Sequence, residues 1–173
     1  SLNEIKSSLV LKATISDFTL SGRGATCIFF EQGYIIGVRC FMNEKITIRR
    51  FAETDAETVQ NIIHRGLREI NGKDYPAELM EEYCNYFTLE KIKNQANSAH
   101  MYVAVSGDEI VGTGSIAPYW GSEKESILLT IYILPEMIGH GVGSAIINTL
   151  EQDEYFLRAE RIEIPSSVTA VKK

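Results

Sequence analysis

The sequence predicts an α/β protein in which helices cover one mixed sheet. Apolar residues make up 45% of the chain and charged residues 23%, which is typical of a globular protein. From Lys45 onward, segments with strand periodicity and segments with helix periodicity alternate along the chain. Their order is one strand, several helices, three strands, one helix and one strand. This order is typical of a mixed sheet covered by helices.

The strand and the helices come first. Residues 45–51 alternate between polar and apolar side chains, as a half-buried strand does. Thr54 and Glu57 form a capping-box pattern, which predicts that a helix begins at this point. Pro76 suits the first turn of a second helix, and Thr88 can cap a third.

The remaining strands surround the last helix. Residues 101–105 and 109–116 are separated by a short polar turn, which predicts an antiparallel hairpin. Residues 127–134 are nearly all apolar, as in a strand that is buried on both faces. An apolar stripe over residues 142–157 predicts one helix, and residues 161–164 form a further predicted strand.

Charge and cysteine content exclude several classes of function. The net charge is −6, and binding of phosphates needs clustered Lys and Arg, so we expect no nucleic-acid partner. No apolar run reaches the roughly 18–20 residues that cross a bilayer, so we expect no membrane partner. Cys27, Cys40 and Cys84 are widely spaced, which favours free thiols over a disulfide framework or a zinc site. We therefore expect a cytoplasmic protein without a metal ion.

The segment from Ile131 to Ser144 combines a strand, a glycine-rich turn and the start of a helix. Gly139, Gly141 and Gly143 alternate with other residues in the turn. Glycine permits positive φ and close approach of a ligand, and the first amides of a helix point outward with partial positive charge. The pattern lacks the lysine of a Walker loop and the spacing of a dinucleotide fingerprint. It suits a pyrophosphate, and a turn that binds nothing is the alternative.

Four segments follow one another along the chain: IRRF, VAVSGDEIVGTGSI, IYILPEMIGHGVGSAIINTLE and RIEIP. In this order they resemble the GNAT superfamily of acetyl-CoA-dependent N-acetyltransferases, and the resemblance covers about residues 42–173. It implies a mostly antiparallel central sheet flanked by helices. It also implies transfer of an acetyl group from acetyl-CoA to a primary amine of a small molecule or peptide. A CoA-binding domain without catalysis and an oligomeric interaction module are the alternatives.

The resemblance further implies which residues bind the co-substrate. Backbone groups of Ile131, Tyr132 and Ile133 would contact the pantetheine and the thioester. The residues that would wrap the pyrophosphate are Gly139, His140, Gly141, Val142, Gly143 and Ser144. The family's Gln or Arg at the start of this turn is replaced by Ile138.

The proton transfers of such a reaction need a base and an acid. Glu163 matches the place of a glutamate base on the family's fifth strand, and Glu125 is a candidate that would act through water. A solvent-facing carboxylate is the alternative for both. Thr130 stands near the position of a carboxylate in many relatives and cannot itself act as the base. The acceptor pocket would be lined by Tyr75, Tyr83, Tyr86, Tyr119 and Trp120, with Glu81 or Glu82 attracting an amine.

Residues 1–41 are expected to form a separate N-terminal extension. By the resemblance, the family's last helix and last two strands, with the tyrosine that protonates the thiolate, are missing from the C-terminal part of the chain. Residues 29–34 faintly resemble that missing passage. The extension would then complete the sheet, either within the same chain or by exchange in a homodimer. An unrelated extension with strands of its own is the alternative.

Overall fold

The structure of the protein is a computed structural model. It describes residues 26–31, 34–39, 45–119 and 122–165. The chain divides into two units, Ser1–Glu44 and Lys45–Lys173. In the first unit, β1 (Thr26–Glu31) and β2 (Tyr34–Arg39) form a two-stranded antiparallel sheet. The completion of the larger sheet by residues 1–41 stays a prediction.

The second unit is built around a five-stranded sheet in the order β3-β4-β5-β6-β7. The strands are β3 (Ile46–Arg50), β4 (His100–Ser106), β5 (Glu109–Pro118), β6 (Glu125–Ile133) and β7 (Arg161–Glu163). Neighbouring strands are antiparallel, except that β6 and β7 are parallel. The predicted mostly antiparallel sheet is confirmed.

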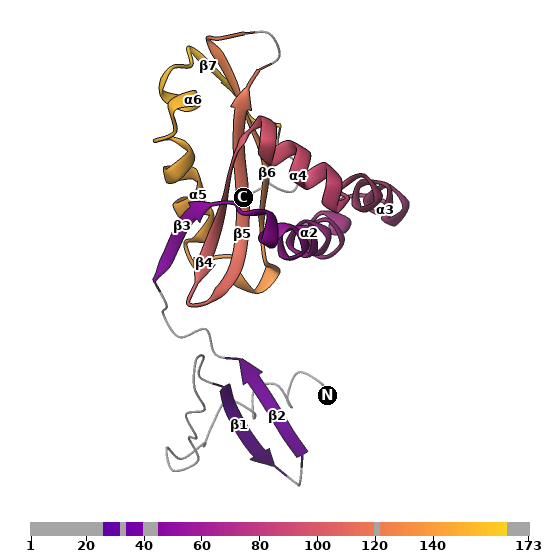
Figure 1. Cartoon of the computed structure of the whole chain (residues 1–173). Helices are drawn as coiled ribbons and strands as arrows, with labels where there is room; N and C mark the ends of the chain where they lie inside the picture. The colour runs from indigo at the N-terminus through magenta and orange to yellow at the C-terminus, as the bar shows by residue number, and fades with distance from the viewer. Residues whose placement is uncertain (1–25, 32–33, 40–44, 120–121, 166–173) are drawn as a thin grey trace. The chain divides into compact units, whose positions relative to one another are not determined.

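Helices cover both faces of this sheet (Figure 1). One layer holds α2 (Ala56–Arg65), α3 (Ala77–Tyr86) and α4 (Leu89–Ser98). The other holds α5 (Val142–Leu150) and the short α6 (Glu154–Leu157). Among the described residues, no helix combines the length and the apolar composition that crossing a membrane requires.

The first helical layer encloses a hydrophobic core against the sheet. Its buried members are Val59, Ile63, Leu67, Met80, Cys84, Ile92, Met101 and Val103. Helix α2 continues into a π-helical turn, η3 (Gly66–Ile70). A Cβ atom placed on Gly66 would lie 2.7 Å from Cδ1 of Tyr132, so this glycine lets the helical segment approach β6 closely.

The second layer packs on β5 because two glycines leave room for α5. A Cβ atom on Gly112 would lie 3.0 Å from side-chain atoms of Val142 and Ile146. A Cβ atom on Gly114 would lie only 2.5 Å from Cγ2 of Ile146. Since Val142 and Ile146 are buried, the glycines set how closely α5 approaches the strand.

Two predicted helix starts can be compared with the structure. The predicted cap of α4 is confirmed, because Thr88 Oγ1 accepts the N–H of Lys91 at 3.2 Å. The predicted start of a helix near Thr54 is confirmed, but the capping box at Thr54 is wrong. A 3₁₀ turn, η2 (Glu53–Asp55), precedes α2, and the carboxylate of Asp55 accepts the N–H of Ala52 at 2.8 Å.

The single helix predicted over residues 142–157 is also wrong. Helix α5 ends at Leu150, and Asp153 caps the separate helix α6 by accepting the N–H of Tyr155 at 2.9 Å. The predicted apolar stripe does not continue through this break, because the side chain of Leu157 is largely exposed.

Candidate functional site

Strand β6 is only half-buried along its second half. The parallel partner β7 ends at Glu163, opposite Ile127, whereas β6 continues to Ile133. Residues 126–128 are buried, but residues 129–133 are half-buried. The expectation that this strand is buried on both faces is therefore wrong for its second half, because β7 stops short of it.

A bulge interrupts β6 where this second half begins. Thr130 has a φ of 55°, in the left-handed region that β-branched residues rarely occupy. Ser115 on β5 faces Leu129, and Thr113 faces Tyr132, so the register shifts between the two pairs. The extra residue turns the backbone that follows it.

Side chains beyond the bulge alternate between the two helical layers. A Cβ atom on Gly114 would lie 3.5 Å from Cγ1 of Ile131, and one on Gly143 would lie 3.1 Å from Cδ1 of Ile133, so both isoleucines face α5. The ring of Tyr132 points to the opposite layer and meets Phe87 edge-on, with 6.3 Å between the ring centroids. These side chains are occupied in packing, and their backbone groups are what the strand can offer to a ligand.

The phenol of Tyr132 is held in its neutral form. Burial raises the pKa of Tyr132 to about 12, and the nearby Tyr83 adds to the effect. A phenol with this pKa carries its proton throughout the neutral range, so the Tyr132 side chain cannot act as a base there.

The glycine turn follows directly after β6 and a 3₁₀ turn, η5 (Pro135–Met137). Gly139 and Gly141 have φ values of 87° and 83°, and a Cβ atom on either would meet nothing within 4 Å. Both glycines are therefore required by their backbone conformation and border open space. Gly141 is the N-cap residue of α5.

This turn has the features that a pyrophosphate needs. The amides at the start of α5 have no partner four residues earlier within the helix, and the helix dipole adds partial positive charge there. Ile138 and His140 are exposed beside the glycines. The open space, the outward amides and the adjoining half-exposed strand fit the phosphate and pantetheine parts of CoA.

The two predicted bases lie together, away from this strand segment. Arg161 contacts Glu125 at 3.4 Å and Glu163 at 3.1 Å. Glu163 is opposite Ile127, four residues before Ile131, which corresponds to about 13 Å along the strand at a rise of about 3.3 Å per residue. Glu125 is six residues from Ile131, or about 20 Å by the same rise.

A polar group at the bulge was missed by the sequence interpretation. Gln95 of α4 donates hydrogen bonds to Thr130 and Ser115. The spacing along α4 could have indicated this contact. Gln95 lies three residues after the buried Ile92, and therefore on the face of α4 that meets the sheet.

A second polar cluster, which the sequence also did not reveal, lies beside α6. The carboxylate of Asp153 accepts hydrogen bonds from His100 at 2.8 Å and Tyr102 at 2.7 Å. The ring of His100 stacks on that of Tyr155, with 4.2 Å between centroids. This cluster ties α6 to β4, which gives His100 a structural role.

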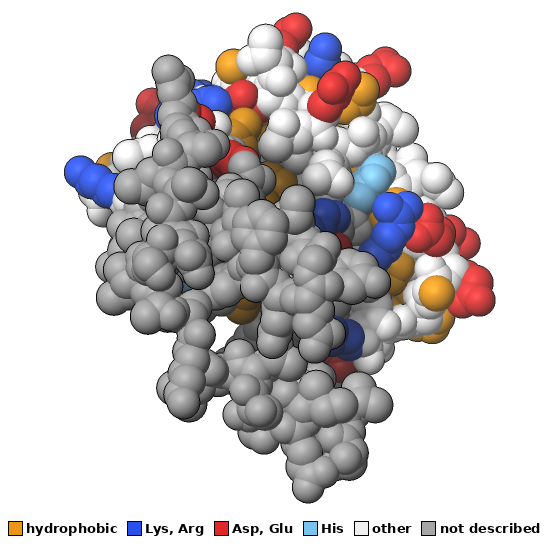
Figure 2. Space-filling model, turned by 90° about the horizontal axis from the view of Figure 1, so that it is seen from below, with side chains coloured by type: hydrophobic (Ala, Val, Ile, Leu, Met, Phe, Trp, Pro, Cys, Tyr) orange, Lys and Arg blue, Asp and Glu red, His pale blue; other side chains and the backbone are white. Residues whose placement is uncertain are grey.

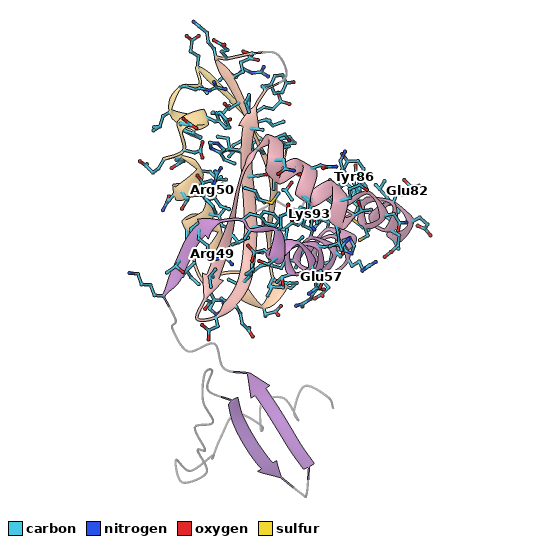
Figure 3. The ribbon with its side chains drawn as sticks, viewed as in Figure 1. Arg49, Arg50, Glu57, Glu82, Tyr86 and Lys93 are labelled. Atoms are coloured by element: carbon cyan, nitrogen blue, oxygen red, sulfur yellow. The ribbon has the colours of Figure 1, made fainter. Side chains whose placement is uncertain are left out.

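The aromatic residues predicted to line an acceptor pocket are not all together. Tyr83 and Tyr86 are exposed on α3, and Figure 3 shows Glu82 and Tyr86 on this helix. Glu81 of the same helix is paired with Arg68 at 2.6 Å. Tyr75 packs against the core, Tyr119 lies under the guanidinium of Arg161, and Trp120 lies outside the described residues.

The part of the surface that can be seen in Figure 2 carries acidic side chains with Lys and Arg side chains among them. This mixed surface agrees with the moderate net charge of −6. Among the residues described, no group of three or more His, Cys, Asp and Glu side chains is arranged to hold a metal ion.

The five-stranded, mostly antiparallel sheet flanked by helices is the fold of the GNAT class. The model of the acetyltransferase (GNAT) family matches residues 61–170, and the chain belongs to this family. None of the curated proteins matches the chain in sequence.

Solved structures share the fold at low sequence identity. The PaiA N-acetyltransferase from Thermoplasma acidophilum, in complex with coenzyme A, is 18% identical with a TM-score of 0.57, over 62% of this chain and 70% of that one. A GCN5-related N-acetyltransferase from Rhodopseudomonas palustris is 19% identical with a TM-score of 0.62, over 73% and 76%. A predicted acetyltransferase from Clostridium acetobutylicum, with acetyl-CoA, is 18% identical with a TM-score of 0.51, over 72% and 82%.

Proposed function

We propose that the protein is an N-acetyltransferase that moves an acetyl group from acetyl-CoA to a primary amine of a small molecule or peptide. One observation carries the proposal: the half-exposed, bulged end of β6 leads into an open turn with two glycines at positive φ. Membership of the GNAT family supports acetyl-CoA as the co-substrate.

Two groups of backbone atoms would hold the co-substrate. The pyrophosphate would be bound by the turn and the first amides of α5, in the residues Gly139, His140, Gly141, Val142, Gly143 and Ser144. The pantetheine and thioester would lie along Ile131, Tyr132 and Ile133. Acetyl-CoA supplies an activated acyl group, and strand amides near its carbonyl would stabilise the oxyanion formed when an amine attacks.

The amine must lose a proton during direct attack. Glu163 is the nearer of the two predicted carboxylates to the second half of β6, and at about 13 Å along the strand it would act through water molecules. Glu125 lies farther along the same strand, so we assign it a lesser part. Arg161 contacts both carboxylates and holds them in place.

The acceptor would approach from the layer of α2, α3 and α4. The exposed rings of Tyr83 and Tyr86 lie on α3, and the side chain of Glu82 is exposed beside them. An ammonium group is attracted both by carboxylates and by aromatic faces. These features favour a cationic amine as the acceptor.

A CoA-binding domain without catalysis is the second candidate. Two observations favour it. Glu125 and Glu163 are both paired with Arg161, and the bulge in β6 carries Thr130, which cannot act as a base. Such a domain would bind acetyl-CoA and release no free thiol.

A turnover assay separates the two candidates. The purified chain is incubated with acetyl-CoA and a panel of primary amines and peptides, and release of free CoA thiol is measured. The proposal predicts release with at least one amine. Glu163→Gln should lower kcat by about a hundredfold if this group is the base. The matched control is Glu160→Gln, because Glu160 is an exposed glutamate paired with Lys124 outside the proposed site. Binding without release from any amine would support the second candidate.

A further inference from the structure

We propose that Gln95 is a positioning residue for acetyl-CoA. Through Thr130 and Ser115, it holds the bulge that presents Ile131–Ile133 to the co-substrate. The inference rests on the proposed function, because it assigns a residue to that same site. Gln95 itself lies on α4 and reaches β6 only through the side chains of Thr130 and Ser115.

One side-chain amide joins β5 and β6 at the bulge. Nε2 of Gln95 donates to Oγ1 of Thr130 at 2.6 Å and to Oγ of Ser115 at 2.8 Å. The hydroxyl of Ser115 then donates to the carbonyl oxygen of Leu129 at 2.9 Å. Both hydrogens of the amide are used, one for β6 and one for β5. The group is partly buried, where such networks are stronger than in water.

Thr130 has a backbone conformation that needs this support. Its φ of 55° is strained for a β-branched residue. Strained residues of this kind persist only when their surroundings hold them, and they gather at functional sites. The hydrogen bond from Gln95 acts on the side chain of the strained residue itself, immediately before Ile131.

The bulge decides where the following backbone groups point. With Thr130 at positive φ, Tyr132 pairs with Thr113 and the residues beyond the bulge lie half-exposed. If residue 130 relaxed to negative φ, this pairing would shift and the N–H and C=O groups of Ile131–Ile133 would turn. Gln95 therefore fixes the direction of the groups that bind the co-substrate.

The test uses the full chain and three variants. Gln95→Leu keeps the approximate size of the side chain and removes the donor. Gln95→Leu with Thr130→Gly places at position 130 a residue that adopts positive φ without support. The matched control is Gln60→Leu, because Gln60 is also half-buried and its Nε2 donates to the carbonyl oxygen of Phe87 at 2.8 Å.

Two quantities are measured for each protein. Hydrogen exchange of residues 128–134 is followed without ligand, and the Kd for acetyl-CoA is measured by calorimetry. Gln95→Leu should speed the exchange and weaken acetyl-CoA binding by about tenfold each, which corresponds to about 1.4 kcal/mol. Gln60→Leu should change neither. Addition of Thr130→Gly should restore both, a rescue that a residue acting only by packing would not allow.

The outcomes are distinguishable. Unchanged exchange in Gln95→Leu, or a folded double variant that still binds weakly, would overturn the proposal. Failure of the wild type to bind acetyl-CoA would contradict the proposed function instead. In that case the exchange rates alone would decide whether Gln95 holds the bulge.

Discussion

Asp153 shows how one side chain joins two parts of the fold. Its side chain is 2% exposed, and its carboxylate accepts hydrogen bonds from His100, Tyr102 and the backbone N–H of Tyr155. Burial by itself raises the pKa of a carboxyl group, but these hydrogen bonds outweigh it, and the pKa of Asp153 lies below its usual value. The ionised form therefore stabilises the junction of β4 and α6.

The lowered pKa of Asp153 predicts how stability depends on pH. A group whose pKa is lower in the folded state stabilises the protein above its unfolded-state pKa of about 3.9, and this stabilisation is lost as the pH falls through the folded-state pKa. The free energy of unfolding should therefore decrease as the pH drops from about 4 to lower values. In Asp153→Asn, part of this fall should be absent, and stability at pH 7 should be lower by about 2 kcal/mol.

Urea denaturation between pH 7 and pH 2.5 measures this effect. The pKa of Asp55 is also lowered, mainly by its hydrogen bond with Arg49. Asp55 therefore also makes stability decrease at low pH, and it is still present in the variant. Parallel profiles of stability against pH for wild type and Asp153→Asn would show that Asp153 does not contribute to the loss of stability at low pH.

At the scale of elements, the fit of α5 against β5 positions the glycine turn. The turn leads directly into α5, whose buried face rests on strand positions that lack side chains, notably Gly114. The atom that an added Cβ would meet is Cγ2 of Ile146, a branched side chain that is fully buried and has little freedom to move. The close packing of this pair therefore needs glycine.

Gly114→Ala tests this dependence. The added methyl group would lie 2.5 Å from Cγ2 of Ile146, so α5 or the strand must shift. We expect a loss of about 1–3 kcal/mol in the free energy of unfolding, measured by urea denaturation. The control is Gly72→Ala, where the nearest atom is 3.5 Å from the added Cβ. Equal stability of the two variants would contradict the account of the packing.

At the scale of the whole molecule, the order of strands and helices could be predicted because periodicity is a local property. The glycine turn could also be predicted from a short segment, because its three glycines can be read directly from the sequence. The bulge was not, because Thr130 is a β-branched residue that gives no sign of positive φ. The partners of the polar clusters were also hidden. Gln95 lies 35 residues from Thr130, and His100 lies 53 residues from Asp153.

The family and the site together lead to one central claim, which is that the chain binds acetyl-CoA through its glycine turn. The claim explains why two glycines at positive φ border open space at the start of a helix, and why the strand before them is half-exposed. It does not depend on which amine is the acceptor.

Calorimetric titration of the full chain with acetyl-CoA tests this claim most directly. Gly141→Glu places a negative charge and a strained residue in the turn, and Gly107→Glu is the matched control, because Gly107 also has positive φ but lies between β4 and β5. We expect a Kd on the order of micromolar for the wild type and for Gly107→Glu, and no measurable binding for Gly141→Glu. No binding by the wild type, or equal binding by Gly141→Glu, would contradict the claim.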